Sequence, residues 1–197
     1  DIVVLKYGPA GNLLWTYSYD GDGGDRAAEM RVDAGGNIYV AGTIGPSSEE
    51  LSPVTLKLDP DGHELWRAPE TSVNLQGGTA NGLDVDSAGN VVTVARDQLY
   101  GMIWKYDANG NRQWMARYRA EQPASVYASE VRFDGSGNII VGARSGWDAL
   151  LIKYAADGQQ LWATRITYSG PAYPGVLDLD SGGNPYVTTS FGEDVVT

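Results

Sequence analysis

The sequence predicts an all-β fold built from a tandem repeat of about 48 residues. Three observations support it: a lysine ends an apolar run in every copy, a tryptophan follows nine residues later with a glycine between them, and a Gly-Asn pair precedes a later apolar run. The lysines are Lys6, Lys57, Lys105 and Lys153, the tryptophans Trp15, Trp66, Trp114 and Trp162, and the glycines Gly11, Gly62, Gly110 and Gly158. The Gly-Asn pairs lie at 36–37, 89–90, 137–138 and 183–184.

These landmarks keep the same order in every copy, so residues 1–197 are predicted to form a single repeat array. The expected units are residues 1–44, 45–97, 98–145 and 146–192, with the start of a fifth unit at 193–197.

The first unit contains four strand-like segments. Ile2–Tyr7 is almost continuously apolar, and Leu13–Tyr19 alternates around aromatic residues with high β propensity. Ala27–Val32 and Asn37–Thr43 complete the unit. Short segments rich in glycine, such as 8–12, separate these strands and are typical of hairpin turns.

The later units repeat this pattern of four strands. In the second unit the strands are expected at Val54–Leu58, Glu64–Arg67, Asn81–Val85 and Asn90–Ala95. In the third they are expected at Gly101–Tyr106, Arg112–Tyr118, Ala128–Phe133 and Asn138–Ala143. In the fourth they are expected at Asp148–Tyr154, Gln160–Ile166, Gly175–Leu179 and Asn184–Thr189.

Four evenly spaced strands per unit, joined by short turns, are the pattern of a β-propeller blade. No amphipathic helical segment interrupts the strands, which argues against βαβ units and leucine-rich horseshoes. A blade lies between two neighbours, so its strands should be apolar on both faces, as Ile2–Leu5 and Ala149–Ile152 are. A β-sandwich is the second possibility, but the regular period argues against it. The sequence therefore predicts a β-propeller of about four four-stranded blades, with a larger or dimeric ring as an open alternative.

Composition and charge exclude several classes of function. The chain carries 25 acidic and 14 basic residues and a net charge of −11, without the basic stripe that nucleic-acid binding needs. No apolar run is long enough to span a bilayer as a helix, so membrane insertion is not expected. The absence of cysteine excludes disulfides, thiolate nucleophiles and thiolate metal sites.

The residues of the first unit resemble a known family, the bacterial seven-bladed β-propeller repeat (SBBP). The resemblance lies in D-x-x-V-x-K-Y-x-x-x-G-x-L-x-W, which begins at Asp1, and in V-D-x-x-G-N-I-Y-V-A-G-T, which begins at Val32. The turns also resemble NHL repeats. This resemblance implies a secreted or cell-surface bacterial propeller that serves as a binding scaffold.

The resemblance also implies where each strand lies in a blade. The segment ending at Asp33 is expected innermost and the segment carrying Trp15 outermost. The chain then opens with two outer strands and closes with two inner strands, and the two halves could pair. Three outcomes follow: a small four-bladed ring, an eight-bladed ring made of two chains, or a part of a longer array. The last is favoured, and a homodimer comes second, because 193–197 would compete with Asp1–Leu5 for one position.

Asp20, Asp22 and Asp25 place three carboxylates in one glycine-rich loop. Calcium prefers oxygen ligands from such loops, so this loop is a candidate calcium site. The other units do not repeat these carboxylates, and a solvated loop is the favoured interpretation. No other cofactor is expected.

The recurring polar residues are interpreted as parts of the scaffold. Each of Asp33, Asp86, Asp134 and Asp180 is expected to accept backbone N–H bonds within its own turn. The repeated lysines are expected to pack along a neighbouring tryptophan, with the ammonium reaching a carboxylate or a carbonyl. His63 is the only histidine, so a histidine metal cluster is impossible and a serine triad improbable.

Residues that break the repeat are the better candidates for function. The extra aromatics suit stacking on sugars or anchoring a protein interface, and two arginines occupy matching positions where they could pair with acids. These candidate ligand-binding residues are Arg96, Tyr100, Trp104, Tyr127, Arg144, Trp147, Tyr168 and Tyr173. The sequence therefore predicts a non-enzymatic scaffold that binds a protein or a glycan through loops on one face. The alternatives are a lyase or hydrolase with an acidic channel site, and a structural unit completed by strand exchange.

Overall fold

The computed structural model describes residues 1–21, 23–46, 50–70, 79–97, 99–119, 125–167 and 172–191. Within these residues the chain forms sixteen antiparallel strands and no helix. A search of the same residues found no helix with the length and hydropathy needed to span a membrane.

Twelve of the strands form three complete four-stranded blades, in which neighbouring strands follow chain order. Blade 1 contains β3 (Arg26–Val32), β4 (Ile38–Ile44), β5 (Ser52–Leu58) and β6 (Glu64–Pro69). Blade 2 contains β7 (Ala80–Val85), β8 (Val91–Arg96), β9 (Gly101–Tyr106) and β10 (Arg112–Tyr118). Blade 3 contains β11 (Val126–Phe133), β12 (Ile139–Ser145), β13 (Asp148–Tyr154) and β14 (Gln160–Ile166).

The remaining four strands form two half-blades, one at each end of the array. The first hairpin pairs β1 (Ile2–Tyr7) with β2 (Leu13–Tyr19), and the last hairpin pairs β15 (Ala172–Leu179) with β16 (Pro185–Phe191). By repeat position, β1 and β2 correspond to the outer strands β5 and β6, whereas β15 and β16 correspond to the inner strands β3 and β4. The expected order of strands within a blade is confirmed, and the blades are three complete ones with two halves.

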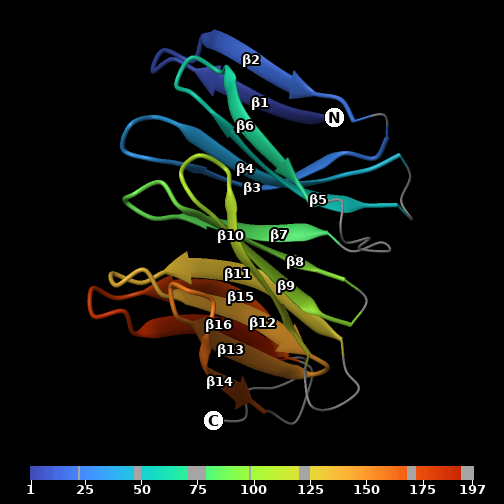
Figure 1. Cartoon of the computed structure of the whole chain (residues 1–197), viewed down its shortest axis with the longest axis vertical. Helices are drawn as coiled ribbons and strands as arrows, with labels where there is room; N and C mark the ends of the chain where they lie inside the picture. The colour runs from blue at the N-terminus through green and yellow to red at the C-terminus, as the bar shows by residue number, and fades with distance from the viewer. Residues whose placement is uncertain are drawn as a thin grey trace.

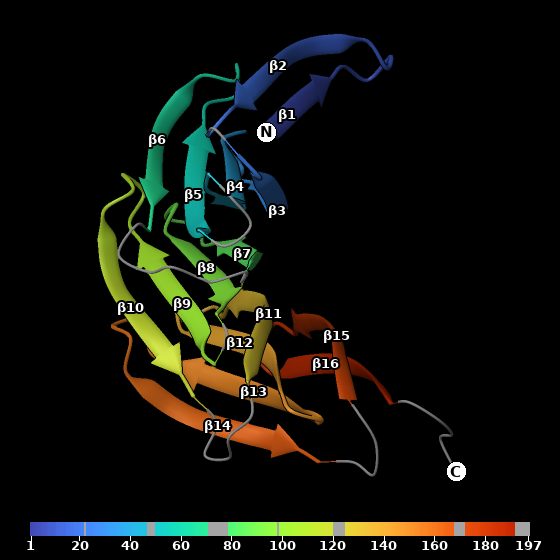
Figure 2. The same ribbon diagram turned by 90° about the vertical axis from the view of Figure 1, so that its right-hand side faces the viewer.

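The sheets are stacked one on another from the first hairpin to the last (Figure 1). Seen from the side, they follow an open arc with β3, β7 and β11 on its concave side and β6, β10 and β14 on its convex side (Figure 2). The two half-blades lie at opposite ends of this arc, so they do not pair within one chain. The possibility of a small ring closed by the chain itself is therefore wrong.

The core lies between successive sheets rather than at one centre. Strand β4 illustrates the arrangement: Ile38 and Val40 belong to a cluster shared with β1, whereas Tyr39 and Ala41 belong to a cluster shared with blade 2. Successive side chains of a strand point to opposite faces. Because a sheet lies against each face, both sets of side chains are apolar and buried.

At three of their four positions, the repeated lysine and tryptophan join one sheet to the next. The Lys6 Nζ and the Trp15 Nε1 both donate to the backbone carbonyl of Pro60, at 2.7 and 3.1 Å. A Cβ added to Gly62 would lie 2.8 Å from the Trp15 ring, so the indole sits directly on this turn. Lys57 and Trp66 bind the Ala108 carbonyl in the same way, and Lys105 and Trp114 bind the Ala156 carbonyl. We call this arrangement the Lys-Trp clamp, and it confirms the scaffold interpretation of both residues.

Candidate binding face

The two ends of the strands present different surfaces. One face carries the hairpin turns within each pair of strands, and these turns are built alike. The strand ends at the opposite face lead into connections that differ from unit to unit, among them β12–β13 (Figure 1).

The repeated aspartates belong to the uniform turns. Asp33 Oδ1 accepts the N–H groups of Gly35 and Asn37, both at 2.9 Å, and Oδ2 accepts the Asn37 amide. The same bonds form around Asp86, Asp134 and Asp180. Burial opposes ionisation of Asp134, but hydrogen bonds from Lys153 and Asn138 outweigh it and lower the pKa of Asp134 to about 2. The prediction that these carboxylates stabilise their own turns is confirmed.

His63 also lies in a uniform turn, next to the β5–β6 hairpin aspartate Asp59. Its side chain is 77% exposed, and its Nδ1 lies 2.9 Å from the Asp59 Oδ2. It therefore takes part in turn structure on the face opposite the variable loops.

On the variable face, two arginine guanidiniums lie over the ring of one tyrosine. Tyr127 lies near the start of β11, opposite Arg144 of β12 in the strand register. The Arg144 guanidinium lies 4.7 Å from the centre of the Tyr127 ring. The guanidinium of Arg96, at the end of β8 in the preceding blade, lies 5.0 Å from the same ring. All three side chains are half-buried, and we call them the Arg-Tyr-Arg stack.

Two further predicted residues lie in connections on the same face. Trp147 occupies the two-residue turn between β12 and β13, where Gly146 has a φ of 62°. Its indole is 69% exposed, the highest value among the large hydrophobic side chains of the described residues. Tyr100 precedes β9, and its ring lies 5.9 Å from the Arg119 guanidinium.

The remaining predicted ligand-binding residues do not join this group. The prediction for Trp104 is wrong, because this side chain is fully buried on β9 in the core between blades 1 and 2. Tyr168 lies outside the described residues. Tyr173 lies on β15, where its backbone pairs with Ser190, and its side chain is outside the described part of the structure.

The predicted calcium loop brings Asp20 and Asp25 together, and Asp22 is outside the described residues. Carboxylate oxygens of Asp1, Asp20 and Asp25 lie within 4.8 Å of one another. Asp25 is buried, and its carboxylate accepts N–H bonds from Gly21 at 2.5 Å and Gly45 at 3.4 Å. These bonds give Asp25 a role in shaping the loop, and calcium binding stays a prediction.

The concave side of the arc carries a set of charged residues that the sequence interpretation missed. Arg31 pairs with Glu29 on β3 and lies 3.8 Å from Asp84 on β7. On β11, Arg132 pairs with Glu130 at 3.2 Å. We call these five residues the channel cluster. The Glu-x-Arg pair of β3 recurs on β11, whereas β7 carries Asp84 at the repeat position of Arg31 and Arg132.

Burial changes the acidity of two carboxyls in the channel cluster. Burial raises the pKa of Asp84, although an N–H bond from Phe133 at 2.8 Å and the nearby Arg132 and Arg31 act in the opposite direction. Burial likewise raises the pKa of Glu130, against the lowering effect of Arg132. A carboxyl with a raised pKa can hold a proton closer to neutral pH.

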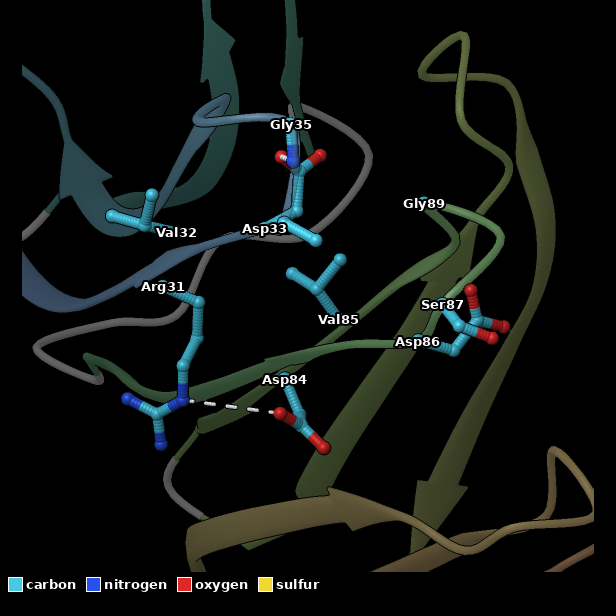
Figure 3. A pocket seen from close by; sticks show the side chains of 10 residues that line it. Arg31, Val32, Asp33, Gly35, Asp84, Val85, Asp86, Ser87 and Gly89 are labelled. Carbon is cyan, nitrogen blue, oxygen red and sulfur yellow. Dashed lines mark hydrogen bonds and ion pairs between the residues drawn. The ribbon is translucent and has the colours of Figure 1, made fainter. Parts of the chain in front are cut away.

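A pocket of about 470 Å³ opens beside this cluster, between the β3–β4 and β7–β8 turns. Figure 3 shows Arg31 and Asp84 facing one another at its base, with Asp33 and Asp86 in the two turns above. The two turn aspartates accept N–H groups of their own turns, and the Arg31 Nε lies 3.8 Å from the Asp84 carboxylate at the base of the pocket.

Comparison with known proteins supports the fold and leaves the function open. No protein-family model and no curated protein matches the sequence. A protein of unknown function from Bacteroides caccae aligns with a TM-score of 0.57 and 16% identity, over 90% of this chain and 57% of its own. A protein from Lactobacillus plantarum aligns with a TM-score of 0.59 and 16% identity, over 97% of this chain and 63% of its own. The chain thus spans about three fifths of the length of these two proteins.

A third similar structure is a subtype N11 neuraminidase-like protein of A/flat-faced bat/Peru/033/2010 (H18N11). It aligns with a TM-score of 0.53 and 11% identity, over 95% of this chain and 67% of its own. At such identities the likeness concerns the fold alone. The chain is an all-β protein with the β-propeller fold, and the resemblance to SBBP repeats stays a prediction.

Proposed function

We propose that this propeller is a glycan-binding module that recognises sugars carrying carboxylates through its variable face. The observation that carries this proposal is the Arg-Tyr-Arg stack together with the exposed indole of Trp147. A flat exposed indole stacks on the apolar face of a sugar ring. Guanidinium groups bind carboxylates through paired N–H donors. A secreted or cell-surface location, which the SBBP resemblance implies, suits this role.

The arrangement of the stack favours a charged ligand over a neutral one. In a chain of net charge −11, Arg96 and Arg144 concentrate two positive charges on one ring. Both guanidiniums contact the Tyr127 ring, which reduces the side-chain entropy that binding would remove. The long-range field of the protein opposes an anionic ligand, so recognition depends on these short-range contacts.

The test is calorimetric titration with oligomers of galacturonic acid and, for comparison, neutral galactose oligomers. We expect binding of the acidic oligomer and at least tenfold weaker binding after Trp147→Ala, about 1.4 kcal/mol. Arg144→Gln should remove the preference for the acidic oligomer. The control is Leu161→Ala, which removes a half-exposed apolar side chain from the outer strand β14. Equal affinity for both oligomers, or an unchanged affinity of Trp147→Ala, contradicts the proposal.

A second candidate function is acid–base catalysis at the channel cluster, and the raised pKa values of Asp84 and Glu130 favour it. A protonated carboxyl beside arginines can act as a general acid in the cleavage of a glycosidic bond. New reducing ends released from the acidic oligomer, and their loss in Asp84→Asn, support this candidate. An intact oligomer after prolonged incubation with the native chain rejects it.

A further inference from the structure

The two half-blades leave complementary surfaces uncovered, and the complete blades indicate what covers them. On β1, the residues Val3, Leu5 and Tyr7 are 47%, 49% and 57% exposed. The positions corresponding to Leu5 are Leu56, Trp104 and Ile152, and all three are buried against the preceding sheet. The positions corresponding to Val3 are also buried, and they are Val54, Met102 and Leu150. The positions corresponding to Tyr7 are buried too, and they are Leu58, Tyr106 and Tyr154. The outer side of β1 is therefore a blade interface without its neighbour.

The last hairpin exposes the other half of such an interface. Tyr186 on β16 is 64% exposed, and its counterparts Tyr39, Val92 and Ile140 are fully buried. Tyr39 shares a core cluster with Leu83 of the next blade, and Ile140 shares one with Leu177. The residue corresponding to Leu83 and Leu177 on β3 is Met30, which is 49% exposed. Tyr186 and Met30 thus occupy the two positions that contact each other where one complete sheet packs on the next.

The Lys-Trp clamp is also incomplete at both ends. Blade 3 carries Lys153 and Trp162, but among the described residues the Trp162 indole N–H has no acceptor, and Lys153 turns to Asp134 of its own blade at 2.8 Å. The first hairpin carries the matching turn, in which Pro9 corresponds to Pro60. Gly11 of that turn has open space where Gly62, Gly110 and Gly158 each have a tryptophan ring.

The strand register fixes how the halves would join. In blade 1, β4 pairs with β5 so that Tyr39 lies opposite Lys57 and Val40 opposite Leu56. The same register would place Tyr186 opposite Lys6 and Val187 opposite Leu5. In blade 1 the Lys57 Nζ lies 4.9 Å from the centre of the Tyr39 ring, a contact that Tyr186 and Lys6 would repeat. A groove of about 230 Å³ between β1 and β3, lined by Leu5, Ala28 and Met30 among others, lies where the inserted hairpin would pack.

We propose that two copies of this chain close into one ring by exchanging these hairpins. The last hairpin of one copy adds its edge strand β16 to β1 of the other, so that the four strands form a composite blade. Lys153 and Trp162 of the first copy then bind the Pro9 carbonyl of the second. The open arc keeps the two halves of a single chain apart (Figure 2), and the two uncovered surfaces complement one another, which favours a second copy as the occupant. Two such joints complete both half-blades to four strands and use surfaces other than the Arg-Tyr-Arg stack.

The first test is the mass of the 197-residue chain in solution, measured by sedimentation over a range of concentrations. We expect a dimer whose dissociation constant rises at least about tenfold with Leu5→Asp, because the carboxylate would be buried in the joint. The matched control is Leu14→Asp on β2. Leu14 is 53% exposed, and its counterparts Leu65 and Leu161 are exposed to a similar degree in complete blades, so this variant should dimerise normally. Tyr186→Ser weakens the dimer from the other surface, and circular dichroism shows which variants remain folded.

The second test measures the register by disulfide formation, which is simple because the chain contains no cysteine. A mixture of Leu5→Cys and Val187→Cys chains, oxidised with glutathione disulfide, should give a covalent dimer. A mixture of Leu5→Cys and Ser190→Cys should not, since Ser190 corresponds to a position three residues out of register. A monomer at every concentration would overturn the proposal and leave further blades of a longer chain as the occupant. A dimer that Leu5→Asp and Tyr186→Ser both leave intact would overturn it as well.

Discussion

At the scale of single residues, the repeat is maintained by contacts that each blade makes with the next. Gly110 has a φ of 82°, and an added Cβ would lie 2.7 Å from the ring of Trp66. The recurrence of glycine at this repeat position thus has two causes. The backbone is left-handed there, and an indole approaches closely.

These two causes can be separated by substitution. Gly110→Ala should lower the free energy of unfolding by about 2–4 kcal/mol, because backbone strain adds to displacement of the indole. Gly137→Ala is the control, since Gly137 has a φ of 77° and nothing within 4 Å of an added Cβ. It should lower the free energy of unfolding by only about 1–2 kcal/mol. Urea denaturation measures both, and equal losses would mean that the Trp66 contact adds nothing.

At the scale of strands and blades, neighbouring sheets are also joined by polar contacts that do not repeat. Glu70, which follows β6, is buried, and its carboxylate accepts a hydrogen bond from the Tyr106 hydroxyl at 3.0 Å. Arg112 of β10 donates to the other oxygen of the same carboxylate. Glu70, Tyr106 and Arg112 thus join blades 1 and 2. The position of Tyr106 corresponds to Tyr154 in blade 3, which lacks such partners among the described residues.

Removal of one hydroxyl tests this junction. Tyr106→Phe should lower the free energy of unfolding by about 1–3 kcal/mol, because a buried carboxylate oxygen loses its donor. Tyr154→Phe is the matched control at the corresponding position, where the hydroxyl forms no hydrogen bond within the described residues, and it should change stability by less than about 0.5 kcal/mol. Chemical denaturation at neutral pH compares the two. If both substitutions lower the free energy of unfolding by a similar amount, the loss comes from removing a hydroxyl at this repeat position and not from the contact with Glu70.

The sequence predicts the elements well where the signal is local. Ile2–Tyr7, Leu13–Tyr19 and Gln160–Ile166 have the expected bounds, because apolar runs and turn glycines delimit them. The inner strands begin earlier than expected: β11 starts at Val126 and β15 at Ala172, each with a break in register near its start. Such bulges and starting points are set by pairing with the adjacent strand, which a single segment does not reveal.

The candidate binding face could likewise be predicted only in part, because contacts between blades are not visible in a single segment. Arg96, Tyr127 and Arg144 were identified because they break the repeat, although their mutual stacking depends on two adjacent blades. Trp104 was misassigned because its large aromatic ring drew more weight than its position, which is that of Leu56 and Ile152 and therefore faces a neighbouring sheet. The channel cluster was missed although Arg31 and Asp84 occupy one repeat position with opposite charge. This change of charge at one repeat position is the signal in the sequence that would have identified the channel cluster.

At the scale of the whole molecule, the stability of stacked sheets depends mainly on nearest neighbours. Among the residues whose side chains the structure describes, the core cluster between blades 2 and 3 contains twelve buried residues, whereas the one between blade 3 and the last hairpin contains three. Each half-blade also has a neighbour on one face only. The ends of the arc should therefore open at a lower free energy than the middle.

Hydrogen exchange followed by mass spectrometry measures this gradient. In dilute protein, amides of β1 and β16 should exchange faster than those of β8 and β9, which lie within a complete central blade. Raising the chain concentration should slow exchange in β1 and β16 selectively, since only these edge strands gain hydrogen-bonded partners in the composite blade. The Leu5→Asp variant serves as the control, in which concentration should have little effect. Uniform exchange along the chain would mean that the arc opens as one cooperative unit, and protection of the ends in dilute protein would mean that β1 and β16 are already covered.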